Sequence, residues 1–369
     1  MVLMKHKALI WVDSAVPDPS KDSGSVRLFS ILRILISEGH TILFTSQKID
    51  LTSKAVSNLR EIGVLVFESL NAIHSHAEDH NIEISSVWVS RITVLREVKS
   101  SVKSLFKGVP IVFDTVDLHY LRLRRDAIKR QSLYSLLAAL RLEVIEKWHV
   151  KNSDLAIVVS ESERERLLWA APKLGVHVLS NVHVTPKKLP KFDLTAGLVF
   201  IGGFSHTPNI VGIMWFCTEV WPYLNDTIKQ DQLKIIGSNT PKEVENLAGQ
   251  HIQVLGWLED PEPTILKSRI SIAPLLSGAG VKGKVGQAMA LGVPVVGTQI
   301  ALEGIQGAGD PVAIIANEAR GFAQAINDLY FDKVAWQGIQ ARARGASQAL
   351  FGVEQTRVNL LSITDTLGL

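Results

Sequence analysis

The chain has 369 residues, 46% of them hydrophobic, with one cysteine and a formal net charge of +3, and its length suits two domains of about 150–200 residues. The single cysteine, Cys217, excludes an intrachain disulfide and a cysteine-ligated metal cluster, so we expect a reducing, cytoplasmic compartment. No run of about 18 apolar residues occurs, and the short apolar run before Asp13 is too small for a signal peptide, so no membrane span is expected.

The first half of the chain alternates strand-like and helix-like segments, which is typical of a doubly wound parallel sheet. Amphipathic spacing predicts a helix over residues 26–40 that ends at Gly39. We expect further helices at 51–63, from about 121 to 149 and at 161–171, and strands at 7–13, 41–47, 64–69, 84–90, 110–116 and 153–160.

A long loop joins the first strand to the first helix and ends in Asp22, Ser23, Gly24 and Ser25. Serine and aspartate are favoured as helix N-caps, so one interpretation of this loop is purely structural. A second loop, after the strand at 110–116, carries Asp117, His119 and Tyr120. Open α/β sheets bind ligands at the carboxyl ends of their strands, although His119 also fits a buried histidine without function.

Charge is unevenly placed: residues 1–190 carry a net +6 and residues 191–369 a net −3. Part of this excess lies on one predicted helical face, formed by Arg122, Arg125 and Lys129. Such a face is either simply solvated or binds anionic lipid or an anionic acceptor.

Residues 184–197 combine two prolines with several charges and are interpreted as a linker between domains. The second half again alternates strands and helices. Strands are expected at 198–203, 232–238, 252–257, 270–276, 294–298 and 311–316, and helices at 209–220, 284–291 and 318–330, with a helical tail from 336 to 369.

The stretch 278–298, GAGVKGKVGQAMALGVPVVGT, is the most informative part of the chain. Between a strand and a helix it places three glycines and two lysines: Gly278, Gly280, Lys282, Gly283 and Lys284. Glycine lets the backbone approach a ligand, helix N-terminal N–H groups point outward, and ammonium groups add positive charge. This combination favours phosphate binding, although it matches neither a Walker loop nor G-x-G-x-x-G.

This stretch resembles the signature of group 1 glycosyltransferases, in which a glycine-rich loop leads into E-A-M-A-x-G-x-P-V-V. The GH turn at 39–40, DLHYLR, GGFSHTPN and GWLEDPEP occur in the order that the family shows. The resemblance implies the GT-B fold: two Rossmann-like, doubly wound parallel-sheet domains facing a cleft, with a C-terminal helix crossing back to the first. The implied domains are an acceptor-side domain at 1–185, a nucleotide-sugar domain at 186–345 and a helical tail at 346–369.

The resemblance also assigns roles to residues. It places Gly24 and Ser25 near the donor phosphates or the acceptor, and His119 beside the transferred sugar, as the catalytic candidate. It places Trp257 and Leu258 against the nucleobase. The remaining donor-binding candidates are Gly203, Ser205, Gly280, Lys282, Gly283, Lys284, Gln287 and Glu303.

Two departures from the family pattern stand out. The loop GFSHTPN lacks the arginine and lysine that usually meet the donor diphosphate, so Lys282 or Lys284 must supply the charge, assisted by Ser205. Most relatives carry two glutamates eight positions apart, where this chain has Ala279 and Gln287. Glutamine can still hydrogen-bond ribose hydroxyls, and Glu303 is a stand-in for the missing carboxylate.

The sequence thus predicts a glycosyltransferase that moves a sugar from a nucleoside-diphosphate sugar to a glycan or lipid-linked acceptor, with retention, in synthesis of cell-surface polysaccharide or glycoconjugate. No D-x-D pair lies in a donor loop, so transfer without metal or cofactor is expected. The expected location is the cytoplasm, peripherally at the inner face of the membrane. The alternatives are a catalytically silent GT-B homologue that binds a glycan or partner, and a sugar-nucleotide epimerase of the same fold, whose T-E-R-P-E signature is absent.

Overall fold

The computed structural model describes residues 6–129, 131–170, 175–278, 280–305 and 310–368, without the side chains of Asp126, Lys129 and Ala170. Ala279 lies outside the described residues. The chain forms two compact units. Unit 1 comprises Met1–Val182 with Thr356–Leu369, and unit 2 comprises His183–Gln355.

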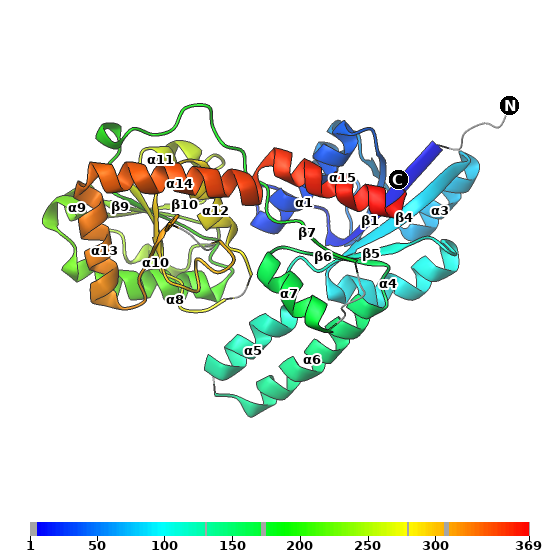
Figure 1. The fold of residues 1–369 in the computed structure, drawn as a ribbon, viewed down its shortest axis with the longest axis horizontal. Helices are drawn as coiled ribbons and strands as arrows, with labels where there is room; N and C mark the ends of the chain where they lie inside the picture. Colours follow the sequence, from blue (N-terminus) through cyan, green and yellow to red (C-terminus); the bar gives the residue numbers. More distant parts are fainter. Residues whose placement is uncertain (1–5, 130, 171–174, 279, 306–309, 369) are drawn as a thin grey trace. The chain divides into compact units, whose positions relative to one another are not determined.

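Unit 1 is built on a parallel sheet of seven strands within the described residues, in the order β3-β2-β1-β4-β5-β6-β7 (Figure 1). The inner strands β5 and β6 are buried along their whole length, as expected where helices cover both faces of a sheet. The strands are β1 (His6–Ala15), β2 (Thr41–Lys48), β3 (Leu65–Val66), β4 (Ile82–Ser90), β5 (Ile111–Asp114), β6 (Leu155–Val158) and β7 (Gly175–Val178).

Helices connect these strands in the order expected of a doubly wound sheet. The first, α1, begins after Asp22, whose side chain accepts from the Ser25 N–H, and it buries leucines and isoleucines at helical spacing. The helices of unit 1 are α1 (Ser23–Ser37), α2 (Lys54–Glu61), α3 (Leu70–Asp79), α4 (Ile92–Leu105), α5 (His119–Lys129), α6 (Leu133–Lys151), α7 (Glu161–Ala170) and most of α15 (Val353–Leu367).

The single helix predicted from about 121 to 149 is wrong, because the structure has two helices, α5 and α6, that lie side by side as a hairpin (Figure 1). Gln131 adopts a φ of 50°, which a helix does not allow. The Ser132 side chain then accepts from the Ser135 N–H and begins α6.

The C-terminal helix belongs to unit 1, as the predicted fold requires. Arg357 on α15 contacts Glu38 at the end of α1 across 2.5 Å. Asn359 donates to the carbonyl of Val178 in β7, and Lys7 in β1 donates to the carbonyl of Gly368. These contacts hold the returning chain on the first sheet.

Unit 2 has a second parallel sheet, with six strands within the described residues in the order β10-β9-β8-β11-β12-β13. Its core joins buried phenylalanines and aliphatic side chains of the sheet to those of α8 and α13. The strands are β8 (Leu198–Ile201), β9 (Leu233–Ile236), β10 (Ile252–Gly256), β11 (Ile270–Ala273), β12 (Val295–Gly297) and β13 (Ile314–Ile315).

The helices of unit 2 cover this sheet. A single π-helical segment at Phe216–Val220 continues α8, and short 3₁₀ turns lie at Phe192–Leu194 and Trp221–Tyr223. The α-helices are α8 (Thr207–Trp215), α9 (Asp226–Gln230), α10 (Lys242–Glu245), α11 (Glu262–Leu266), α12 (Gly283–Ala290), α13 (Ala319–Phe331) and α14 (Lys333–Phe351).

Two Rossmann-like, doubly wound parallel sheets confirm the predicted fold class. In each sheet the strand order reverses once, between β1 and β4 in unit 1 and between β8 and β11 in unit 2. Ligands of such sheets bind beyond the carboxyl ends of the strands at this reversal. Across the described residues, no helix combines the length and apolarity needed to traverse a bilayer.

Candidate active site

The strand reversal in unit 2 brings the predicted phosphate loop to the carboxyl ends of β8 and β11. After β11 the chain turns through Gly278 and Gly280, whose φ angles of 130° and 70° favour glycine. Helix α12 begins at Gly283, and among the described residues no side-chain hydrogen bond caps it. The first N–H groups of a helix lack intrahelical acceptors, so this end of α12 suits an anion.

Lys284 occupies the first turn of α12 and is the most constrained cation of the loop. Its Nζ donates to Asn209 Oδ1 across 2.5 Å and lies 4.8 Å from the centre of the Phe200 ring. Burial, together with the nearby charge of Lys282, lowers the pKa of Lys284 to about 7. A cation that is poorly solvated and beside a second cation gains stability from an incoming anion.

Asn209 on α8 links this lysine to the loop after β8. Its Nδ2 donates to the carbonyl of Gly203 across 2.7 Å. A side chain at Gly202 would come within 2.8 Å of the Asn209 amide, so glycine is required for this approach. The structure therefore brings Gly203 and Lys284 together through Asn209.

Lys282 braces the loop internally. Its Nζ donates to the carbonyl of Gly280 across 2.5 Å and lies 4.0 Å from Glu303 Oε2. The proposed stand-in carboxylate, Glu303, is thus placed beside the loop lysine. Gln287 lies three residues after Lys284 on the same helix, so the two share one side of α12.

The other donor candidates divide in two. Ser205 follows β8, and its Oγ accepts from Asn239 Nδ2 across 2.8 Å, which places it at the ends of β8 and β9. Leu258 packs partly buried against a small core cluster, whereas Trp257 leaves 53% of its surface exposed. A pocket of about 380 Å³ near β10 is lined by Thr240, Glu245, Ala248, Val254, Leu255 and Gly256. None of the predicted donor residues lines it.

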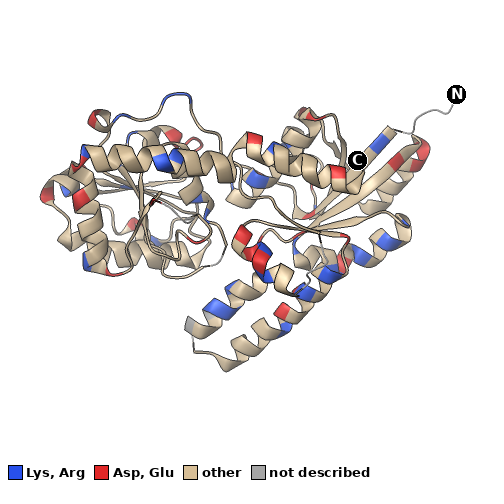
Figure 2. Cartoon of the chain, viewed as in Figure 1, with Lys and Arg blue, Asp and Glu red and all other residues tan. Residues whose placement is uncertain are grey.

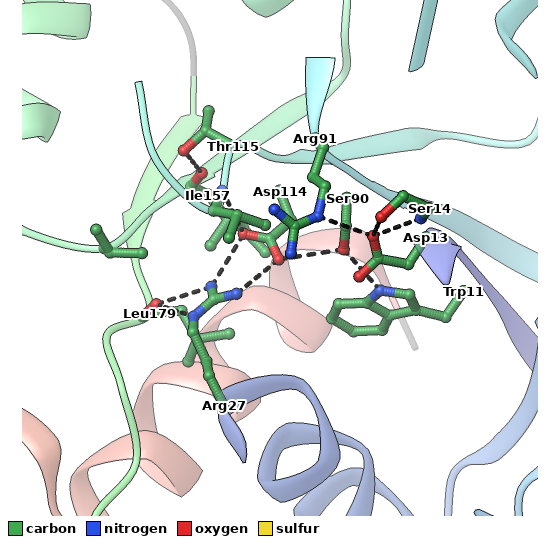
Figure 3. A network of polar contacts seen from close by, with 12 residues as sticks. Trp11, Asp13, Ser14, Arg27, Ser90, Arg91, Asp114, Thr115, Ile157 and Leu179 are labelled. Carbon is green, nitrogen blue, oxygen red and sulfur yellow. Dashed lines mark hydrogen bonds and ion pairs between the residues drawn. The ribbon is translucent and has the colours of Figure 1, made fainter. Parts of the chain in front are cut away.

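Unit 1 has a buried polar network at its own strand reversal (Figure 3). Asp114 at the end of β5 accepts two hydrogen bonds from Arg27 of α1, at 2.7 and 2.9 Å, and both side chains are buried. Arg27 also donates to the carbonyl of Leu179, and Ser90 Oγ lies within reach of Asp114. The pair joins α1, β4, β5 and the segment after β7.

Arg91 extends this network toward the surface (Figure 3). Its Nε donates to Asp13 Oδ1 across 3.1 Å, and its φ of 71° is unusual for a residue other than glycine. Burial raises the pKa of Asp13, although Arg91 opposes this shift. Ser25 donates from its N–H and its hydroxyl to Asp22, so these two residues form the N-cap of α1. A Cβ atom at Gly24 would lie 3.5 Å from Arg91 Nη2.

His119 is the first residue of α5, and its ring is largely withdrawn from solvent. His119 Nε2 lies 2.8 Å from Asp117 Oδ1, and Arg122 lies 3.0 Å from Asp117 Oδ2. Burial alone would raise the Asp117 pKa, but His119 and Arg122 hold it below its usual value. Asp117 therefore lies in ion-pair contact with the ring of His119.

Glu146 of α6 holds the backbone of His119 by hydrogen bonds. Glu146 Oε1 and Oε2 accept from the N–H groups of His119 and Tyr120 at 3.1 and 2.9 Å. Burial raises the pKa of Glu146 to about 7, although these hydrogen bonds favour the charged form. Glu146 thus replaces a conventional N-cap for α5.

Sequence reasoning missed Asn209, Glu146, Arg91 and the Arg27–Asp114 pair. Each contacts a partner far away in the sequence, with Asn209 separated by 75 residues from Lys284.

Within the described residues, no group of three or more His, Cys, Asp or Glu side chains is placed to hold a metal ion.

Comparison with known proteins finds a family match within the second unit. Residues 195–332 match the family model "Glycosyl transferases group 1". A Klebsiella pneumoniae protein described as an uncharacterized 44.6 kDa protein in the cps region is 24% identical over 353 residues, which cover 86% of this chain and 89% of that protein.

Solved structures share the fold over almost the whole chain. Sucrose-phosphate synthase from Thermosynechococcus elongatus superposes with a TM-score of 0.73 at 16% identity, covering 98% of this chain and 99% of that one. Anabaena HepE in complex with UDP superposes with a TM-score of 0.69 at 12% identity, covering 97% of this chain and 100% of that one. The GT-B fold and the resemblance to group 1 glycosyltransferases are confirmed, and the family match over residues 195–332 indicates a glycosyltransferase.

Proposed function

We propose that this chain, a GT-B glycosyltransferase, moves a sugar from a nucleoside-diphosphate sugar to a glycan or lipid-linked acceptor. The observation that carries the proposal is Lys284, a poorly solvated ammonium held by Asn209 at the N-terminus of α12. A diphosphate is the ligand that suits a helix N-terminus, a glycine-rich turn and a buried cation together.

In this proposal the donor diphosphate lies against the first turn of α12. Gly280 and Gly283 let the backbone N–H groups approach the phosphates, and Lys284 contacts one of them directly. Lys282 remains on the loop, where its contacts with Gly280 and Glu303 shape the turn. As the bond to the sugar breaks, negative charge grows on the departing diphosphate, and these fixed positive groups stabilise it without a metal ion.

The remaining donor candidates keep their assignments as parts of this proposal. Gly203 and Ser205 flank the phosphates, Gln287 donates to and accepts from the ribose hydroxyls, and Trp257 offers its exposed ring to the base. Leu258 supports that loop from the core side, because it packs against the small apolar cluster beneath it.

His119 is proposed as the residue of unit 1 that contacts the transferred sugar. Its ring is held by Asp117 and its backbone by Glu146, so the imidazole is preorganised. Gly24 and Ser25 lie at the start of α1 at the same edge of the sheet, where a ligand can approach the backbone. Retention of anomeric configuration is part of this proposal, as the family resemblance implies.

The identity of the nucleotide and of the product draws on proteins with the same fold. Structures of Anabaena HepE contain UDP, UDP with glucose, and UDP-glucose, so we propose a UDP-sugar as donor. The relative from Klebsiella pneumoniae is described by its place in a cps region, which supports a role in cell-surface polysaccharide. We further propose that unit 1 contacts an anionic membrane surface from the cytoplasmic side.

A thermal-shift panel of UDP, GDP and ADP, with their sugars, tests the donor assignment. A ligand at 100 times its dissociation constant adds about 2.7 kcal/mol to the free energy of unfolding, so UDP should raise the melting temperature while GDP and ADP do not. A protein that none of these nucleotides stabilises would contradict the proposal. Slow hydrolysis of the UDP-sugar without acceptor separates an enzyme from a homologue that only binds.

A further inference from the structure

Helix α6 carries an apolar stripe on its solvent side. The stripe side chains are between 44% and 70% exposed, and they recur every three or four residues at Leu133, Leu137, Leu140, Val144 and Trp148. At 1.5 Å per residue the stripe is about 22 Å long. Tyr134, which is even more exposed, stands beside its first residue.

The core of unit 1 does not account for this stripe. The opposite side of α6 is the buried one, with Ala139, Glu146, His149 and Val150 turned toward the unit. A surface helix normally has one apolar face and one polar face, whereas α6 has apolar residues on both. A contiguous exposed apolar surface of this size marks an interaction site.

Basic side chains lie near one end of the stripe, beside Trp148. Residues 92–107 carry four basic residues against one acidic residue: Arg96, Lys99 and Lys103 recur at helical spacing along α4, and Lys107 lies in the turn just after it. Lys99 joins the two helices, since its Nζ lies 5.1 Å from the Trp148 ring and donates to the Asn152 carbonyl. Figure 2 shows Lys and Arg along both α4 and α5.

We infer that α6 lies in the interface of an anionic lipid bilayer, with its apolar stripe among the acyl chains and the basic residues of α4 at the phosphate headgroups. This inference deepens the proposed membrane contact and is independent of sugar transfer. A helix with an apolar stripe beside lysines and arginines is the usual interfacial element. A second copy of the chain fits less well, because the same basic residues would then face one another.

The test is sedimentation of the full chain with vesicles, without donor or acceptor. The chain should bind vesicles of phosphatidylcholine with 30% phosphatidylglycerol, and not pure phosphatidylcholine, in low salt. Each basic residue near an anionic surface contributes about 1 kcal/mol, so Lys103→Gln with Lys107→Gln should weaken binding on the order of tenfold or more. Raising the salt concentration should weaken wild-type binding as well.

The stripe is tested by Leu137→Ser with Val144→Ser, which should weaken vesicle binding about tenfold or more while leaving the melting temperature within a few degrees. The matched control is Leu194→Ser with Val334→Ser, which replaces two even more exposed apolar residues of unit 2 and should bind like the wild type.

Equal binding of the stripe variant and the wild type would overturn the inference, as would equal binding of wild type to neutral and anionic vesicles. A wild-type dimer that the stripe variant abolishes, with vesicle binding unchanged, would also overturn it and assign the stripe to a second copy. If a variant does not fold, the comparison of wild-type binding to neutral and anionic vesicles still tests the inference. Failure here leaves donor binding intact, because donor binding is measured without lipid.

Discussion

The Lys284 ammonium donates to the Asn209 side-chain oxygen across 2.5 Å, at the point where β8 and β11 end. Asn209 is itself oriented, because its amide nitrogen donates to the Gly203 carbonyl. The amide therefore fixes the ammonium without neutralising it. In a site built this way the lysine is in position before the donor arrives, and the incoming diphosphate favours its charged form.

Lys284→Ala should weaken binding of UDP. A charge-assisted hydrogen bond to phosphate contributes roughly 1.5–3 kcal/mol, which corresponds to about tenfold to more than hundredfold in affinity. Lys282→Ala should have a smaller effect, since this lysine already binds Gly280 within the loop. Calorimetry with Lys242→Ala as the control for an exposed lysine checks the assignment, and wild-type affinity in both loop variants would show that phosphate binds elsewhere.

The affinity for a UDP-sugar should fall as the pH rises above 7. Burial lowers the Lys284 pKa to about 7, so the unliganded lysine loses its proton from about this pH upward, while the diphosphate of a UDP-sugar does not titrate there. Binding then requires proton uptake, and affinity should fall by up to about tenfold per pH unit between pH 7 and 8.5. Lys284→Arg stays charged and should lose this dependence. A wild-type affinity that is constant over this range would contradict the lowered pKa.

The alternation of the two sheets could be predicted because each buried strand is a short apolar run bounded by turn residues. The break between α5 and α6 could not, since Gln131 and Ser132 carry no glycine or proline signal and the residues on both sides are helix-forming. The turn depends on the positive φ of Gln131 and on packing of the two helices against each other.

The candidate site was predictable only where its residues are neighbours in the chain. The glycines and lysines of the loop before α12 form a local pattern, and so does Asp117 beside His119. The partners that hold them are distant: Asn209 comes from α8, and Glu146 is 27 residues from His119. Spacing in the sequence contains no information on such pairs, which depend on how the strands are ordered.

Asp114→Ala should destabilise unit 1 by about 3–5 kcal/mol, because it leaves the buried Arg27 guanidinium without its carboxylate. The two side chains are about 2% exposed or less, so water cannot replace the lost partner. Lys21→Ala is the matched control, since it breaks the exposed pair with Asp18 and should change stability by less than about 1 kcal/mol. Urea unfolding measures the stability of both variants. Similar losses of stability would show that the buried Arg27–Asp114 pair stabilises the fold no more than the exposed pair does.

Glu146→Gln should change how stability depends on pH. The Glu146 pKa rises from 4.5 to about 7 on folding, so between these values the folded carboxyl keeps a proton that the unfolded chain releases. The stability of the wild type relative to the variant should therefore fall as the pH rises from 5 to 7, by on the order of 2 kcal/mol. Urea titrations of both proteins at several pH values give this difference, to which His119 and Asp117 also contribute because their charges interact with Glu146. A constant difference would mean that Glu146 is ionised throughout.

His119→Ala tests whether unit 1 takes part in the chemistry. Asp117 contacts the ring and Glu146 holds the backbone, so the imidazole that we propose as the sugar contact is held in place. In a retaining transfer the bond to the diphosphate loosens early, and a contact of this kind stabilises the transition state more than the ground state. A contact of roughly 3 kcal/mol in the transition state implies a loss of turnover on the order of a hundredfold or more.

The same variant should bind free UDP with wild-type affinity, because the nucleotide is assigned to unit 2. Release of UDP from a UDP-sugar and calorimetry with UDP separate the two effects, with His80→Ala as the control for an exposed histidine of the same unit. Asp117→Asn keeps the ring but removes the charge that orients it, so its turnover should lie between those of wild type and His119→Ala. Wild-type turnover in a folded His119→Ala protein would return this histidine to a structural role at the start of α5.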